Sequence, residues 1–208
     1  NPSTAQSLID AGHWKRARTI LEERVRKAPR DAKATYELAQ VKLAFGAREE
    51  ALKLAQASVE MDGKSADYHF LLGRIYGELA EAAGMFRQLT YGMRFKKEVE
   101  TTLALNPKHV DARYALMLFY LKAPSALGGD KPKAHQTADE IVSIDRWEGY
   151  VAHARLAEEE RDWTAVEEYD LKAVEIAPKE YDSHAALAEF YASDLQGRYT
   201  LAEAQARL

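Results

Sequence analysis

Histidines are the side chains most often used for proton transfer and metal binding near neutral pH, so their spacing is the first test for chemistry. The chain has six, at His13, His69, His109, His135, His153 and His184. No two lie within one helical turn, no His-Glu-x-x-His run occurs, and no serine sits in a Gly-x-Ser-x-Gly turn. The absence of cysteine excludes thiolate chemistry and disulfides. We therefore predict no catalytic residue, no metal site, no cofactor and no enzymatic activity.

The loop at residues 122–133 holds Gly128 and Gly129 among several lysines. A phosphate-binding loop needs glycines spaced to expose several backbone amides, a following Lys-Ser or Lys-Thr, and a preceding strand. Only the glycine pair and the lysines meet this description. We predict instead that Pro124 and the glycines break the chain and that Asp130 caps the next helix.

Composition indicates a helical chain with a sizeable core. Of the 208 residues 47% are hydrophobic and 30% charged, and six prolines and eleven glycines interrupt a sequence rich in Ala, Leu, Glu and Lys. The net charge of −4 is too small to imply binding of nucleic acid. No stretch of about 18 apolar residues exists, so no membrane insertion is expected. A chain without cysteine suits the cytoplasm and the bacterial periplasm equally, which leaves localisation open.

A repeated pattern runs along the chain. Trp14 and Trp163 are each followed, after the same fifteen-residue step, by Pro29 and Pro178. Other helices of the chain combine a leucine with a small residue, an aromatic side chain or both, at Leu38-Ala39, Leu72-Gly73-Tyr76, Leu116-Tyr120 and Leu187-Ala188-Tyr191. Because proline lacks the amide donor and clashes with the preceding turn, it ends the second helix of a pair.

This pattern resembles the tetratricopeptide repeat (TPR) family, whose units of about 34 residues carry Trp-x2-Leu-Gly-x2-Tyr, then Ala-x3-Phe, then Pro. The resemblance implies an all-α, right-handed superhelical solenoid of antiparallel helix pairs. We expect one solenoid over 1–208 with six units: 1–31 (partial), 32–65, 66–109 (with an insertion), 110–146, 147–180 and 181–208 (truncated). Small residues are expected where paired helices approach closely, at Ala17, Ala39, Ala51, Gly73 and Ala154.

In such a solenoid the first helices of successive units line an inner binding surface. Three consecutive units place Tyr36, Phe70 and Tyr114 there, and the positions four residues further along include Gln40, Arg74 and Arg155. The rings could bury apolar side chains of a peptide or helix, while Arg74 or Arg155 takes a carboxylate. The alternative is that the aromatic rings are partly core and contact the neighbouring helix.

One branch of the family, the chaperone-cofactor domains that clamp a C-terminal carboxylate, has Lys and Asn at these positions in consecutive units. Here the corresponding pairs are Tyr36 with Gln40 and Phe70 with Arg74. A ligand of that particular kind is therefore not expected.

The third unit is about ten residues longer than the repeat, with the extra residues around 80–89. We expect both of its helices to be extended by about five residues, roughly one and a half turns, so that the hairpin projects. Its tip carries more apolar side chains than a loop needs, including Met85, Phe86 and Leu89, and these could dock a partner. Alternatively they fold back along the lengthened hairpin.

The expected function is a protein–protein interaction scaffold that binds a peptide or helical segment of another protein within a larger assembly. The alternative is self-association into a homo-oligomer through the solenoid ends or the third hairpin. An excess of Lys and Arg over residues 1–30 and of Asp and Glu over 147–193 is compatible with head-to-tail contact.

Overall fold

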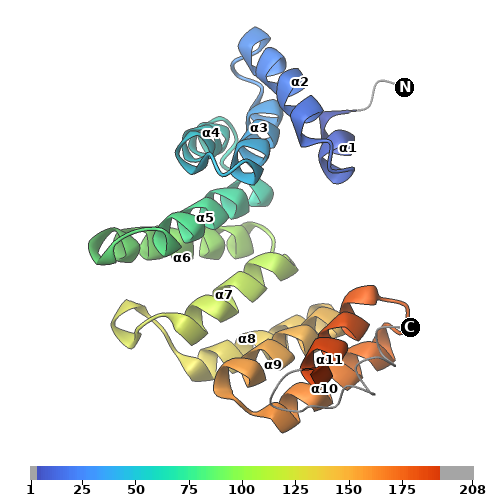
Figure 1. Cartoon of the computed structure of the whole chain (residues 1–208). Helices are drawn as coiled ribbons and strands as arrows, with labels where there is room; N and C mark the ends of the chain where they lie inside the picture. The colour runs from blue at the N-terminus through green and yellow to red at the C-terminus, as the bar shows by residue number, and fades with distance from the viewer. Residues whose placement is uncertain (1–3, 193–208) are drawn as a thin grey trace. The chain divides into compact units, whose positions relative to one another are not determined.

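The computed structural model describes residues 4–192, and in this part of the chain every regular element is a helix (Figure 1). The helices are α1 (Ala5–Asp10), α2 (Trp14–Lys27), α3 (Ala32–Ala44), α4 (Arg48–Met61), α5 (Ala66–Glu81), α6 (Met85–Leu105), α7 (Val110–Lys122), the short 3-10 helix η1 (Ser125–Leu127), α8 (Lys131–Ile144), α9 (Arg146–Glu160), α10 (Trp163–Ile176) and α11 (Tyr181–Ala192). The prediction of an all-α chain is confirmed.

The chain divides into two compact units, with the boundary between Ala112 and Arg113. Each is described by itself below, as unit 1 and unit 2. The division into six repeats remains a prediction. The end of the last predicted repeat, from residue 193 onward, lies outside the described residues.

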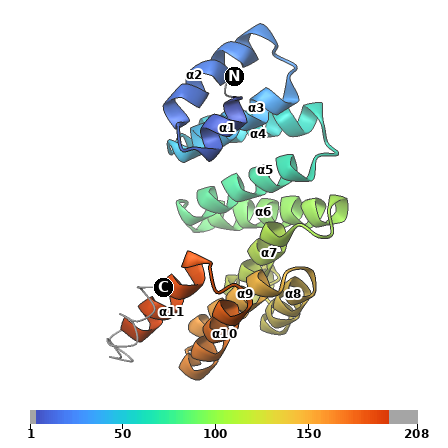
Figure 2. The same cartoon turned by 90° about the vertical axis from the view of Figure 1, so that its right-hand side faces the viewer.

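Unit 1 consists of the successive helix pairs α1–α2, α3–α4 and α5–α6 (Figure 2). Leu21 and Ile75 are fully buried in its two core clusters. The small residues expected at close approaches lie there: Ala17, Ala39 and Ala51 have no exposed surface, and a Cβ on Gly73 would be 3.2 Å from Val99 Cγ2. Small side chains thus let paired helices approach closely enough for leucines and aromatics to fill the remaining space.

The ends of the helices follow the sequence signals. Helices α2, α6 and α10 each end two residues before a proline, at Pro29, Pro107 and Pro178. At the start of α3, the side chain of Asp31 accepts a hydrogen bond from Ala34 N at 2.9 Å, and Asp162 does the same for Ala165 N of α10 at 3.1 Å. These carboxylates satisfy amides that have no partner within their helix.

Three helix pairs close through the same turn. Its key residue has a left-handed backbone, with φ of 72° at Gly12, 73° at Gly46 and 60° at Arg161. The amide that follows this residue returns to the first helix, in the bonds His13 N to Leu8 O (2.7 Å), Ala47 N to Lys42 O (2.9 Å) and Asp162 N to Ala157 O (2.9 Å). Residues with a Cβ adopt this left-handed conformation only at a cost in energy, whereas glycine does not. The backbone at Arg161 is therefore strained, and the backbone at Gly12 and Gly46 is not.

The α5–α6 hairpin is longer than its neighbours, as expected, but the extension is unequal. Helix α5 has 16 residues against 13 in α3, whereas α6 has 21 against 14 in α4. The expectation that both helices lengthen alike is wrong, because Gly84 starts α6 soon after α5 ends and most of the extra residues join the second helix.

Unit 2 contains most of α7 and the helices α8 to α11, and it buries Ile141, Leu156 and Leu187 completely. Its loop after α7 has a structural reason for both glycines. Gly128 has φ of 93°, and a Cβ on Gly129 would lie 1.7 Å from the carbonyl oxygen of Ala123. Asp130 caps α8 by accepting from Lys133 N at 3.1 Å, as predicted.

Candidate functional site

The histidines have packing partners. His69 Nε2 donates to Gly63 O at 3.2 Å, while its Nδ1 lies 2.6 Å from Glu98 Oε2. His184 makes the equivalent Nε2 bond to Pro178 O at 3.1 Å, again six residues earlier in the chain. Both rings are buried, so each of them packs in the interior of its helix pair. Over residues 4–192, no group of three or more His, Asp or Glu side chains is arranged to hold a metal ion.

A hollow surface runs along the first helices of unit 1. Three adjoining cavities of about 180, 400 and 290 Å³ share Gln40, and two of them share Tyr36 or Arg74. We call this surface the unit 1 groove. The lining comes from α1, the start of α2, α3, the start and body of α5, and the residues around the start of α7: Gln6, Ile9, Trp14, Lys33, Tyr36, Gln40, Leu43, Ala44, Ser65, Asp67, Tyr68, Phe70, Leu71, Arg74, Glu78, His109 and Asp111.

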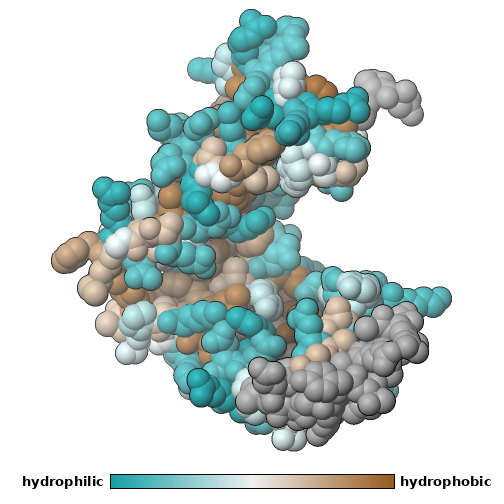
Figure 3. Space-filling view, viewed as in Figure 1, coloured by the Kyte–Doolittle hydropathy of each residue, from teal (hydrophilic) through white to brown (hydrophobic). Residues whose placement is uncertain are grey.

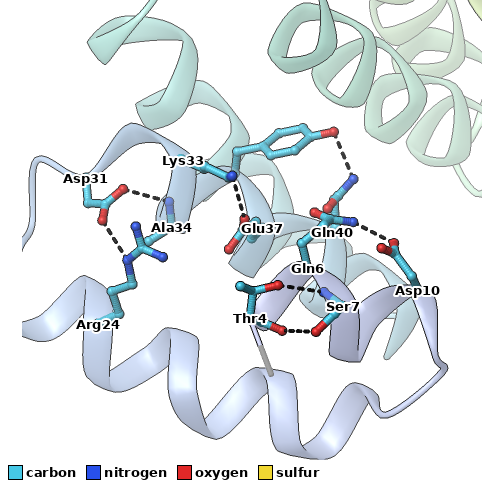
Figure 4. Close-up of polar contacts among 11 residues, drawn as sticks. Thr4, Gln6, Ser7, Asp10, Arg24, Asp31, Lys33, Ala34, Glu37 and Gln40 are labelled. Atoms are coloured by element: carbon cyan, nitrogen blue, oxygen red, sulfur yellow. Dashed lines mark hydrogen bonds and ion pairs between the residues drawn. The ribbon is translucent and has the colours of Figure 1, made fainter. Parts of the chain in front are cut away.

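One wall of the groove is built from two stacked tyrosines. The rings of Tyr36 and Tyr68 are 4.7 Å apart between centroids and inclined by 28°. Burial raises the pKa of Tyr36 to about 12, so its hydroxyl keeps its proton at physiological pH. That hydroxyl accepts a hydrogen bond from Gln40 Nε2 at 2.9 Å, a contact visible in Figure 4. Its own proton remains available for a partner in the groove.

Gln40 is fixed by that bond and has an unmatched acceptor. Its Oε1 atom is buried and has no hydrogen-bond partner among the described residues. A buried amide oxygen without a donor is costly, and such atoms in native proteins are usually satisfied by water or a ligand. Because Gln40 lines all three cavities, a group bound in the groove is in position to supply the missing donor.

The other side of the groove carries Phe70 and Arg74 from α5. The Phe70 ring packs against His109, with centroids 4.6 Å apart. Arg74 is exposed, and its guanidinium has no ion pair or hydrogen bond to any residue within 4–192. Asp67 stands near the same cavity, 3.8 Å from His109 Nε2, with 71% of its side chain exposed. The groove therefore combines aromatic surface with one unneutralised cation and a separate acidic position.

The structure brings together four of the six predicted peptide-binding residues, Tyr36, Gln40, Phe70 and Arg74. Tyr114 and Arg155 belong to unit 2. There, Arg155 donates to Glu158 Oε2 and Glu159 Oε1, both at 2.8 Å. Burial raises the pKa of the half-buried Tyr114 hydroxyl. Arg155 thus already has two carboxylate partners on its own helix, unlike Arg74, and the row of three aromatics stays a prediction.

Sequence reasoning missed Tyr68, His109 and Asp67. The helical face used for the prediction pointed to Phe70 and not to Tyr68. The stacking of Tyr68 on Tyr36 joins neighbouring helices and depends on how α3 and α5 pack. His109 lies just before α7, outside the helical face used for the prediction. The signal that could have found Asp67 and Tyr68 is their place in the first turn of α5, next to the groove.

The tip of the α5–α6 hairpin presents apolar side chains to solvent. Met85 is 75% exposed, Phe86 87% and Leu89 37%. These three side chains therefore do not pack back along the hairpin, which was one of the two alternatives for the tip. Tyr91, by contrast, does pack inward, with its ring 6.1 Å from that of Tyr76. In the part of the chain that the structure describes, no helix is both long and apolar enough to cross a membrane.

Comparisons with known proteins agree with the helix pairs. The tetratricopeptide repeat family matches residues 8–75. No curated protein matches the sequence of the chain. A thermophilic TPR protein of Thermus thermophilus is 22% identical over 91% of this chain and 96% of its own, with a TM-score of 0.77.

Two further solved structures share the fold. A tetratricopeptide repeat protein of Parabacteroides merdae is 20% identical over 97% of this chain and 74% of its own, with a TM-score of 0.65. YrrB, described as a TPR protein with an unusual peptide-binding site, is 16% identical over 89% of this chain and 88% of its own, with a TM-score of 0.53. The α-solenoid fold class predicted from the sequence is thereby confirmed. Residues 8–75 thus match the tetratricopeptide repeat family, and the chain as a whole shares the fold of solved TPR proteins.

Proposed function

We propose that the unit 1 groove binds an extended peptide segment of another protein, with an acidic side chain or terminal carboxylate of that segment placed on Arg74. The TPR fold is a scaffold for protein–protein interaction, and TPR proteins bind other proteins or peptides. The finer assignment to this groove rests on its own residues.

The observation that carries the proposal is a pair of unmatched groups on one surface. Arg74 has no anionic partner and Gln40 Oε1 has no donor among the described residues, although both line the same cavity. A peptide supplies both needs at once, because its carboxylate accepts from the guanidinium and its backbone N–H donates to the amide oxygen.

The aromatic side chains fit the same kind of ligand. Tyr36, Tyr68 and Phe70 are each held against another ring, so little side-chain entropy is lost when a partner packs on them. An apolar side chain next to the acidic residue would lie on these rings. Asp67 and Asp111 add an acidic border, which favours a ligand with a basic residue near that end.

YrrB offers a parallel for this use of the fold, since its description names a peptide-binding site. At 16% identity the likeness concerns the fold alone, so it supports the plausibility of a groove ligand and not its sequence.

The test is selection of peptides from a randomised library by the purified chain, followed by affinity measurement on the selected peptides. We expect enrichment of Asp or Glu beside an apolar residue. Arg74→Gln should weaken binding by about 10- to 150-fold, because a charge-assisted hydrogen bond contributes about 1.5–3 kcal/mol. Arg155→Gln is the matched control, since that guanidinium already bonds Glu158 and Glu159. Selection without acidic residues, or equal losses for the two variants, would refute the proposal.

Self-association through the ends of the solenoid or through the third hairpin is the alternative function. The last turn of α2 is basic and the run Glu158-Glu159-Glu160 is acidic, although Arg24 pairs with Asp31 and the first two glutamates bond Arg155. Light scattering over a wide range of concentration measures it. A mass that stays monomeric at high concentration excludes this alternative and leaves the groove proposal intact.

A further inference from the structure

The outward face of the first half of α6 carries an uncovered row of apolar side chains. Met85, Phe86, Leu89 and Met93 are 75%, 87%, 37% and 63% exposed. Their spacing places them along one side of the helix, because residues three and four apart are neighbours on a helical surface. We call them the α6 stripe. Figure 3 shows light-brown side chains projecting where the tip of this hairpin lies in Figure 1.

The opposite face of α6 holds the stripe in this orientation. The Tyr91 ring stacks on Tyr76, and Phe95 packs so closely on α5 that a Cβ on Gly77 would lie 3.3 Å from its ring. Val99 is completely buried one turn further on. The stripe is therefore not free to turn inward without breaking the pairing of α5 with α6.

The charged side chains of the chain segment that carries the stripe are basic. Residues 82–97 contain Arg87, Arg94, Lys96 and Lys97 and no Asp or Glu. Arg94 donates to the Tyr76 hydroxyl at 3.3 Å, and Lys96 lies 3.8 Å from Glu100, whereas Arg87 and Lys97 are exposed beside the stripe. The nearest carboxylates along the chain are Glu81, at the end of α5, and Glu98, which contacts His69.

The neighbouring hairpin tips of unit 1 continue this surface. The ion pair between Arg48 and Glu78, 3.0 Å long, joins the start of α4 to the end of α5 and so brings the two tips together. At the α3–α4 tip, Phe45 is 42% exposed and Arg18 lies over its ring, 5.0 Å from the centroid. An exposed aromatic ring with a basic neighbour thus recurs at this second tip, which also carries the exposed acidic residues Glu49 and Glu50.

We propose that this edge of unit 1, led by the α6 stripe, attaches the protein to the surface of an anionic lipid bilayer. A projecting ridge of Phe, Met and Leu flanked by Arg and Lys fits a deformable interface, where the apolar side chains enter the headgroup boundary and the cations contact lipid phosphates. A protein partner would instead need a matching groove. The attachment is peripheral, since no helix within residues 4–192 could span the bilayer.

The test is co-sedimentation of the chain with phosphatidylcholine vesicles, with and without phosphatidylserine, at two salt concentrations. We expect binding only to the anionic vesicles and weaker binding at high salt, because exposed charges are screened. The double variant Arg87→Gln, Lys97→Gln should lower the partition coefficient about 25-fold, from about 1 kcal/mol per basic residue. Phe86→Ser should lower it about tenfold through lost apolar burial.

Tyr181→Ser is the control, since Tyr181 is 77% exposed but belongs to unit 2 and not to the proposed surface. It should bind vesicles like the unchanged chain, and circular dichroism checks that each variant is folded. Three results would overturn the proposal: no binding to anionic vesicles, equal binding to both kinds of vesicle, or unchanged binding by Phe86→Ser. A concentration-dependent dimer that Phe86→Ser abolishes, without vesicle binding, would instead assign the stripe to contact between copies.

Discussion

A buried carboxylic acid in unit 2 makes the stability of the chain depend on pH. Asp170 of α10 is 7% exposed, and burial, together with the nearby charge of Glu158, raises its pKa to about 7. Asp170 comes four residues after the buried Val166, and it occupies the position at which the repeat pattern Ala-x3-Phe has its phenylalanine. No hydrogen bond among residues 4–192 involves its side chain. The folded state therefore favours the neutral acid.

The sign and size of the effect follow from the two pKa values. The folded value of about 7 lies above the ordinary 3.8, so the folded chain binds more protons between these values and its stability falls as pH rises. Three pKa units correspond to about 4 kcal/mol, lost fully only above pH 7. Between pH 5 and pH 8 the expected loss from this one group is about 2.5 kcal/mol.

Urea unfolding at pH 5, 6, 7 and 8 measures this loss in a Trp14→Phe background, where the remaining tryptophans, Trp147 and Trp163, both report on unit 2. Asp170→Asn should remove the extra fall in the free energy of unfolding toward pH 8. Glu175→Gln is the control, because it removes an exposed charge from the same helix. If Asp170→Asn and the parent lose stability in parallel from pH 5 to 8, Asp170 is not a neutral buried acid and the reasoning is wrong.

Three further changes test the fold. Arg161→Gly should stabilise the chain by about 0.5–1 kcal/mol by relieving the left-handed backbone, whereas Arg161→Ala should give no gain; thermal unfolding compares them. Gly129→Ala should cost about 1–3 kcal/mol, because its Cβ would overlap the Ala123 carbonyl, and a normal melting temperature would contradict this. Glu37→Gln should raise the free energy of unfolding most above pH 5, because burial raises the pKa of this carboxyl, which is 2% exposed, and its charged form is costly in the folded chain. A gain in stability that grows toward pH 4 would contradict this.

The helices were predictable because their signals are local. Proline after the second helix, aspartate at the start of a helix and alanine at close contacts each act through neighbours in the chain, and Pro29, Asp130 and Ala51 do what these rules require. The lengths of α5 and α6 were less predictable. Ten extra residues can be divided between two helices in several ways, and no local signal fixed Gly84 as the N-cap residue of α6.

The candidate site was predictable only in part, because a groove depends on packing between helices. Helical periodicity was enough to place Tyr36 with Gln40 and Phe70 with Arg74. It could not show that Arg155 is held by two glutamates, nor that Tyr68 stacks on Tyr36. The free guanidinium and the unmatched amide oxygen became visible only once all the described neighbours of each side chain were known.

The shared left-handed turns also bear on how the chain acquires its structure. Each closes a pair with a hydrogen bond between residues five apart, as in Leu8 O to His13 N and Ala157 O to Asp162 N. Closing so short a loop costs little chain entropy, and contacts near in sequence form fast. Each hairpin can therefore assemble as soon as its second helix has been synthesised, and can serve as the surface on which the next one condenses, in the direction of translation.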